Sequence, residues 1–268
     1  MKTIKLAAFL SVFCISLVLL GCKGDVGPSG PTGPSGPSLT GNISGLVTLT
    51  DSNGVQPVNR SGVTVSIEGT SFSAVTDSTG RWQINSVTTG NYTIDISKNT
   101  YGMSKIQNYQ FVGGGTSYVG NTNLSEVPNF SVSNLAYTVS TGGKIIVTGT
   151  LSYTSSQTNG RNILIFVGNS ASVSSSPALN LGVVAAYDSS MGTSFSVNIT
   201  DETFSNLGLG QGSPAFLIAY ASSAPPANCS RYVDQTTGRF NYTSLSSATS
   251  NVLQVITPDV PFIKSGSR

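Results

Sequence analysis

The chain has 268 residues, of which 38% are hydrophobic, 9% are charged and none is histidine. At roughly 100–200 residues per domain, this length corresponds to one large domain or two small ones. The charged fraction lies far below the ~25% typical of globular proteins. Without histidine, the chain cannot form a Ser-His-Asp triad, a Cys-His dyad or an imidazole metal site.

The first 21 residues have the pattern of an export signal. A basic start at residues 1–5 is followed by an apolar run, residues 6–20, that is too short for a typical membrane-spanning helix. The run ends in Leu19-Leu20-Gly21-Cys22, which resembles the lipobox of bacterial lipoproteins. The resemblance implies cleavage before Cys22, a diacylglycerol on its sulfur and acylation of the new amino group; an ordinary secretory signal is the alternative. Acyl chains would hold the exported chain on a membrane, and we expect the outer membrane, on its surface or periplasmic face.

Processing changes the charge and the cysteine count. Removal of residues 1–21 takes away Lys2 and Lys5 and leaves 11 basic residues against 11 acidic ones. A neutral chain offers no phosphate-binding footprint, so nucleic acid is not an expected partner. Cys14 leaves with the signal and Cys22 is lipidated, so Cys229 has no disulfide partner. We interpret Cys229 as a small, partly buried residue rather than a reactive thiol.

Residues 22–40 are predicted to form a lipid-anchored, extended tether. From Gly24 to Ser38, glycine occupies every third position of five triplets, most of which read Gly-Pro-Ser or Gly-Pro-Thr. This period resembles collagen, in which only glycine fits the axis of three polyproline-type strands. We favour a semi-extended spacer over a stable triple helix, because five triplets are few. The choice among monomer, trimer and polymer stays open.

The next segment, residues 41–127, alternates apolar and polar residues with the period of a β-strand. The alternating apolar sets are Val63, Val65 and Ile67, then Trp82 and Ile84, then Tyr92, Ile94 and Ile96. Turn sequences rich in Gly, Asp, Asn, Ser and Thr separate them, as at residues 51–54, 77–80 and 88–91. Short strands at this spacing, without a helical stripe, predict an antiparallel β-sandwich.

Four motifs occur in order in this segment: residues 45–47, 63–70, 74–82 and 87–93. Together they resemble the carboxypeptidase regulatory-like domain, a seven-stranded transthyretin-like sandwich. Its signature is a T-D-x-x-G-x-aromatic hairpin, here residues 76–82, followed by a G-x-Y-T strand start, here residues 90–93. The resemblance implies a non-catalytic folding, docking or sugar-binding unit and names no ligand.

Five residues of these two motifs have expected structural roles. Asp77 caps its own turn through hydrogen bonds to backbone amides. Gly80 and Gly90 take backbone conformations that a β-carbon would oppose, and Tyr92 starts the following strand. Trp82 stands where the family carries a core aromatic, and we favour a core role over a sugar-stacking platform. The sequence at 77–79 also resembles a Bacteroidetes O-glycosylation motif, but the turn alone explains it, so glycosylation stays open.

Residues 128–262 are predicted to form a second antiparallel sandwich, broadly immunoglobulin- or fibronectin-like, followed by a C-terminal tail at 263–268. The runs at 162–167 and 215–220 are continuously apolar, as in central strands, and residues 253–256 form a further integral strand. No Cys…Trp…Cys spacing supports a true immunoglobulin domain. Long polar loops at 168–177 and 222–241 are where binding is expected on general grounds.

The most ligand-like stretch is residues 221–226, which has four aromatic residues nearby in the sequence. They are Tyr220, Tyr232, Phe240 and Tyr242. The alternative, which we favour, is a solvated loop with core tyrosines.

Motifs for catalysis, metal or cofactor binding are weak. Residues 208–212 lack the G-x-G-x-x-G spacing of a dinucleotide site, and residues 51–54 are not followed by a calcium-binding loop. Asp201 and Glu202 are adjacent, so on a strand they would point to opposite faces and could not act as a catalytic pair. We therefore expect no catalytic residue, no cofactor and no metal.

The sequence favours a non-catalytic, membrane-anchored surface lipoprotein that serves as a binding, adhesion or scaffold module. Its partner would be a glycan or another envelope protein. A structural pilin-like or stalk subunit is the alternative. A glycosidase built from distant carboxylates is the third possibility.

Overall fold

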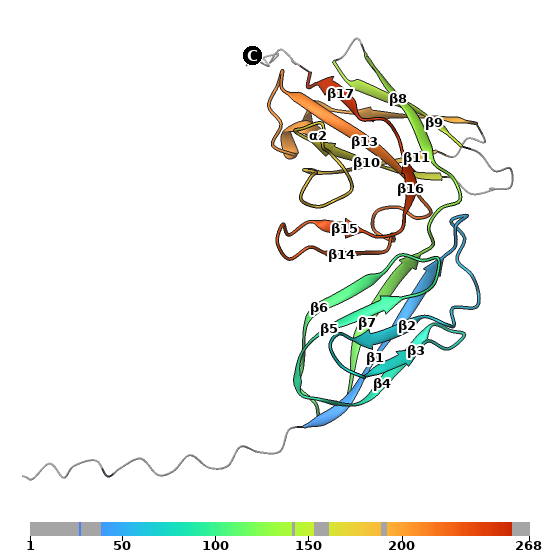
Figure 1. The fold of residues 1–268 in the computed structure, drawn as a ribbon, viewed down its shortest axis with the longest axis vertical. Coiled ribbons are helices and arrows are strands. Elements are labelled where there is room, and N and C mark those ends of the chain that lie inside the picture. The colour runs from blue at the N-terminus through green and yellow to red at the C-terminus, as the bar shows by residue number, and fades with distance from the viewer. Residues whose placement is uncertain (1–26, 28–38, 141–142, 153–160, 189–191, 259–268) are drawn as a thin grey trace, which may run out of the picture. The chain divides into compact units, whose positions relative to one another are not determined.

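Seven strands form the first half of the computed structural model, which describes residues 27, 39–140, 143–152, 161–188 and 192–258 (Figure 1). They are β1 (Thr40–Thr50), β2 (Thr64–Ile67), β3 (Ser73–Val75), β4 (Arg81–Thr88), β5 (Gly90–Ser97), β6 (Ser104–Phe111) and β7 (Thr116–Ser125). The export signal, Cys22 and the C-terminal tail lie outside the described residues, as does the tether up to residue 38 apart from Gly27.

These strands form two sheets, β4-β1-β7 and β3-β2-β5-β6, which we call the N-terminal sandwich. The period-two pattern has the expected consequence, because alternate residues such as Ile43, Val47 and Leu49 of β1 are buried in one apolar core. The predicted sandwich architecture is confirmed. One pair departs from the antiparallel rule, since β1 and β7 run parallel.

The second half contains ten strands and one short helix among its described residues. They are β8 (Val132–Val139), β9 (Ile145–Leu151), β10 (Arg161–Gly168), β11 (Gly182–Asp188), β12 (Ser194–Ile199), α2 (Asp201–Asn206), β13 (Pro214–Ser222), β14 (Arg231–Val233), β15 (Phe240–Tyr242), β16 (Leu245–Thr249) and β17 (Leu253–Ile256). Two sheets, β12-β9-β8 and β11-β10-β13-β16 with β17 paired to β13, enclose a second apolar core. We call this the C-terminal sandwich.

The central strands β10 and β13 are buried on both faces. Ile163 and Ile165 of β10 join the core between the sheets, whereas Leu164 and Phe166 join a third apolar cluster on the opposite side. The hairpin β14–β15 contributes Tyr242 to this outer cluster. A strand covered on both faces has no polar side to display, which explains the continuous apolar runs in the sequence.

Asp201 and Glu202, considered above as they would stand on a strand, belong to the helix α2. Both residues lie in the first turn of α2, where Thr200 is the N-cap and its hydroxyl accepts from the amide of Thr203 at 3.4 Å. Acidic residues favour this position because they interact with the helix dipole. Phe204 then anchors the helix in the core.

Hydroxyl groups buried between the two sandwiches hold them together. The amide of Ser125 donates to Ser230 Oγ at 2.8 Å, and the amide of Ser230 donates back to Ser125 Oγ at 2.9 Å. Ser125 Oγ also lies 2.6 Å from Ser244 Oγ, and all three side chains are fully buried. The contacts of residues 38–268 form one compact unit. The domain boundaries proposed from the sequence stay predictions.

No helix in the described part of the chain is long and apolar enough to cross a membrane.

Candidate functional site

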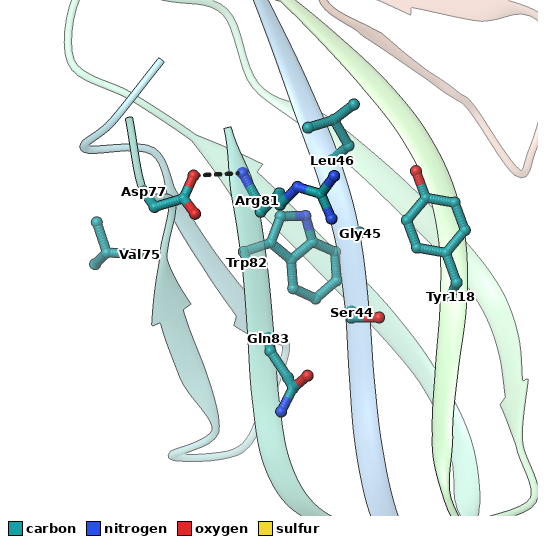
Figure 2. A pocket seen from close by; sticks show the side chains of 9 residues that line it. All are labelled: Ser44, Gly45, Leu46, Val75, Asp77, Arg81, Trp82, Gln83 and Tyr118. Atoms are coloured by element: carbon teal, nitrogen blue, oxygen red, sulfur yellow. Dashed lines mark hydrogen bonds between the residues drawn. The ribbon is translucent and has the colours of Figure 1, made fainter. Parts of the chain in front are cut away.

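A hollow of about 600 Å³ lies at the sheet β4-β1-β7 of the N-terminal sandwich (Figure 2). Its lining comes from all three strands, from Val75 at the end of β3 and from Asp77 in the turn that follows. The strand register places Gln83 of β4 opposite Ser44 of β1, and Ser44 opposite Tyr118 of β7. Residues paired in this way share one face of a sheet. Gln83, Ser44 and Tyr118 therefore form a row across the outer face.

A second row lies beside the first, because Arg81 of β4 pairs with Leu46 of β1. Tyr118 is 60% exposed, and Arg81 and Gln83 are exposed as well. The Tyr118 hydroxyl donates to Asn121 Oδ1, which fixes the end of the ring. We call Ser44, Arg81, Gln83 and Tyr118 the Tyr118 face. It combines one open aromatic ring with a hydroxyl, a guanidinium and an amide.

The inner face of the same strands explains why this segment contains an isolated glycine. Gly45 lies opposite Trp82 in the β1–β4 pair. A β-carbon on Gly45 would lie 2.7 Å from Trp82 Cζ2, so only glycine lets the indole lie against the β1 backbone. Trp82 is 4% exposed and belongs to the apolar core, although it also borders the hollow. A sugar-stacking role would need an open indole face, which this burial does not provide.

The turn before β4 positions Arg81 at the rim of the hollow. Asp77 Oδ1 accepts from the amide of Thr79 at 2.8 Å, from its hydroxyl at 2.7 Å and from the amide of Arg81 at 3.0 Å. The hydroxyl bond from Thr79 is the main reason that the pKa of Asp77 is lowered, with the Arg81 amide next. Gly80 has φ +88°, and its β-carbon would lie 2.1 Å from the carbonyl oxygen of Val47. Glycosylation at 77–79 stays a prediction.

Gly90 behaves differently from the sequence expectation. It is not among the residues with positive φ, so the expectation of an unusual backbone conformation is wrong. The reason for glycine is packing, because a β-carbon there would lie 2.8 Å from the Tyr92 hydroxyl oxygen. That hydroxyl donates to the carbonyl of Thr88 at 2.8 Å. Tyr92 therefore closes the turn between β4 and β5.

The four aromatic residues of the predicted ligand loop do not form one surface. Tyr220 and Tyr242 are buried edge-on against Phe166, with ring centroids 5.4 and 5.7 Å away. Phe240 is 42% exposed, but the guanidinium of Arg231 lies over its ring at 3.9 Å.

Tyr232 lies elsewhere on the hairpin. The ammonium of Lys105 lies 5.8 Å from the centre of its ring. Its hydroxyl accepts from the side-chain amide nitrogen Nδ2 of Asn241 at 2.7 Å.

The sequence reading missed the Tyr118 face. Tyr118 follows a run of three glycines, where the alternation of apolar residues is interrupted. Its pairing with β1 is parallel and bridges more than 70 residues, which local patterns cannot reveal. The detectable signal was the alternation in β1 and β4, which assigns Ser44 and Gln83 to the outer face.

Among the described residues, no group of three or more His, Cys, Asp or Glu side chains could hold a metal ion. The polar groups at the Tyr118 face are suited to hydrogen bonding with a ligand rather than to coordinating a metal.

The model of the carboxypeptidase regulatory-like domain matches residues 42–125. This domain is therefore found in the chain, as its motifs predicted. The match ends at the last residue of β7, so it covers the N-terminal sandwich. No curated protein sequence is significantly similar to the chain.

Several solved structures resemble parts of the chain. A mutant type II cohesin–X-dockerin complex from Acetivibrio cellulolyticus shares 34% identity over 30% of this chain and 51% of that chain, with a TM-score of 0.26. This chain therefore spans about half the length of that one. DUF3823 family proteins from Parabacteroides merdae and Bacteroides ovatus share 10% and 12% identity over 82% of this chain and 100% of theirs, with TM-scores of 0.29 and 0.30. These scores are too low to carry a functional argument.

Proposed function

We propose that the chain is a non-catalytic, saccharide-binding lipoprotein that binds its ligand at the Tyr118 face. The observation that carries the proposal is the row of Gln83, Ser44 and Tyr118 across one sheet, with Arg81 beside it. A sugar ring has apolar C–H faces and a rim of hydroxyls. The C–H faces pack on an aromatic ring, and the hydroxyls exchange hydrogen bonds with amides, hydroxyls and guanidinium groups.

The charge of this face favours neutral or weakly acidic sugars. The carboxylate of Asp77 accepts three hydrogen bonds inside its own turn, so it is committed to the turn rather than to a ligand. Arg81 is the cationic residue at the hollow. Its planar guanidinium can donate to a sugar hydroxyl or pair with a uronic acid carboxylate.

The proposal includes a lipid anchor and a location at the outer membrane. Acylation of Cys22 would place the sandwiches at the outer membrane, behind the tether of residues 22–40. The support is the Leu-Leu-Gly-Cys sequence at 19–22. Mass spectrometry of the N-terminal peptide tests it: a diacylglycerol on the Cys22 sulfur supports the anchor, and an unmodified thiol in the membrane-associated protein rejects it.

The binding test uses a saccharide panel and a chain that starts at residue 22 with Cys22→Ser. We expect at least one saccharide to bind. Tyr118→Ala should weaken that binding roughly tenfold, the equivalent of about 1.4 kcal/mol, because the stacking ring is lost. Tyr137→Ala is the matched control, since Tyr137 is a 37% exposed strand tyrosine that does not border the hollow.

Two results would reject this function. One is a wild-type chain that retains no saccharide. The other is a bound saccharide whose affinity is the same in Tyr118→Ala and Tyr137→Ala. Size-exclusion chromatography of the same chain tests the structural-subunit alternative, because a polymer would give a concentration-dependent ladder. In the structure, β17 is paired with β13 over four residues, as an integral strand would be.

A further inference from the structure

We propose that the junction between the two sandwiches holds a second saccharide site, built from residues of both. A hollow of about 480 Å³ lies there, and we call it the junction hollow. It receives Gln56 from the segment after β1, Asn162 and Tyr187 from β10 and β11, and Ser223 and Asn228 from the loop after β13. Its volume falls in the range of ~300–1,000 Å³ common for small-molecule sites.

The lining of the junction hollow is aromatic and polar but not charged. Tyr187 is 65% exposed, so a ring face is open to a ligand. Gln56, Asn162 and Asn228 provide three primary amides, each with donors and an acceptor. No Asp, Glu, Lys or Arg side chain is among the lining residues. An uncharged ligand with many hydroxyls fits this set better than an ionic ligand does.

The amides are available for a ligand. The hydrogen bonds of the described residues include none from the side chains of Gln56 and Asn162, which are exposed and partly buried, respectively. Asn228 accepts from Asn123 through its oxygen at 3.3 Å, which leaves its amide hydrogens to donate. Ser223 donates to the carbonyl of Glu126 at 2.5 Å, so its oxygen keeps its capacity to accept.

The walls of the junction hollow are held in place before a ligand arrives. The bond from Ser223 to Glu126 and the bond from Asn123 to Asn228 both cross between the sandwiches. The buried reciprocal pair of Ser125 and Ser230 lies on the same junction. A ligand therefore does not need to order these groups, and a preformed site loses less conformational entropy on binding.

The experiment compares Tyr187→Ala, Tyr187→Phe and Gln56→Ala in the chain from residue 22 with Cys22→Ser, by calorimetric titration with the saccharide panel. We expect one saccharide whose affinity falls roughly tenfold in Tyr187→Ala, about 1.4 kcal/mol. It should fall less in Gln56→Ala and stay near wild type in Tyr187→Phe, which keeps the ring. Gln56 is exposed on a loop, so its variant gives a reading even if the strand substitution disturbs folding.

Tyr118→Ala separates this inference from the proposed function. Binding that depends on Tyr187 but not on Tyr118 supports the junction site, even if no ligand is found for the Tyr118 face. Binding that depends only on Tyr118 overturns the junction site and leaves the proposed function standing. No saccharide binding at all rejects both. If Tyr187→Ala instead turns a dimer into a monomer without changing any saccharide affinity, the hollow is an interface between copies and the inference is wrong.

Discussion

The two sandwiches differ in the outer face of one of their sheets, which is covered in one sandwich and exposed in the other. In the C-terminal sandwich, the hairpin β14–β15 contributes to an apolar cluster over the outer sides of β10 and β13. In the N-terminal sandwich, the outer side of β4-β1-β7 carries an exposed tyrosine, an arginine and a glutamine. The same layered architecture therefore gives a third apolar layer in one half and an accessible polar surface in the other.

The largest expected effect comes from removing the third layer. Tyr242 is 8% exposed and lies edge-on against Phe166. We expect Tyr242→Ala to lower the free energy of unfolding by about 3 kcal/mol, as large aromatic truncations in cores do. Tyr118→Ala, on the open face, should lower it by less than about 1 kcal/mol. Chemical denaturation of both variants measures the difference.

The comparison fails if Tyr242→Ala and Tyr118→Ala lower the free energy of unfolding by the same amount. Equal losses would mean either that the hairpin contributes little to stability or that the Tyr118 ring is packed rather than open. Tyr242→Phe is the control for the hydroxyl, because it keeps the ring against Phe166 and should stay close to wild type.

Much of this difference is readable from the strands themselves. The run at 162–167 is apolar at nearly every position, which predicted a central strand, whereas β1 alternates, the pattern of a strand with one open face. The hairpin β14–β15, which covers the outer side of these central strands, was not predictable from the sequence. Phe240 and Tyr242 lie in a short segment whose polar neighbours suggested a solvated loop, and the residues that they cover are far away in sequence.

The candidate site was only partly predictable for a related reason. Local patterns specify turns, so the positions of Asp77 and Gly80 follow from the motif. They do not specify which strands pair, and the Tyr118 face exists because β7 pairs in parallel with β1. The junction hollow is harder still to predict, because its residues come from four separate segments of the chain.

An intermediate effect is expected where the two sandwiches meet. Gly102 is buried, and a β-carbon there would lie 2.5 Å from Ser230 Cβ and 2.8 Å from Ser244 Cβ. Gly102→Ala should therefore destabilise the chain by about 1–3 kcal/mol, the usual cost of overpacking. Because the strain falls on the junction, binding at the junction hollow should weaken while binding at the Tyr118 face is kept.

Gly69→Ala is the control for glycine replacement as such. Gly69 also lies in the N-terminal sandwich but has φ +73° and no atom near its β-carbon, so its cost would come from the backbone alone. If Gly102→Ala unfolds like wild type, the junction is looser than its contacts indicate. A loss of ligand binding in Gly69→Ala equal to that in Gly102→Ala would show that the effect is not specific to the junction.

The smallest expected effect concerns a kind of turn that occurs once in each of the two sandwiches. Asp77 before β4 and Asp234 before β15 each accept a threonine hydroxyl and backbone amides, and each turn contains a glycine with positive φ followed by arginine. The pKa of Asp77 is lowered, chiefly by the Thr79 hydroxyl. The pKa of Asp234 is lowered, chiefly by the Thr237 amide and then by its hydroxyl.

A lowered pKa in the folded state fixes the sign of the pH dependence. The carboxylate stabilises the fold above its unfolded pKa, near the usual aspartate value of 3.8, and this contribution is lost as the pH falls through the lower pKa of the folded state. Asp77→Asn keeps an oxygen acceptor but loses the charge, so its melting temperature should lie below wild type at pH 7. The gap should close on acidification below about pH 4, and Asp234→Asn should behave alike because the chemistry is the same. A gap that stays constant down to pH 2 in either variant would show that the turn depends on the shape of the side chain and not on its charge.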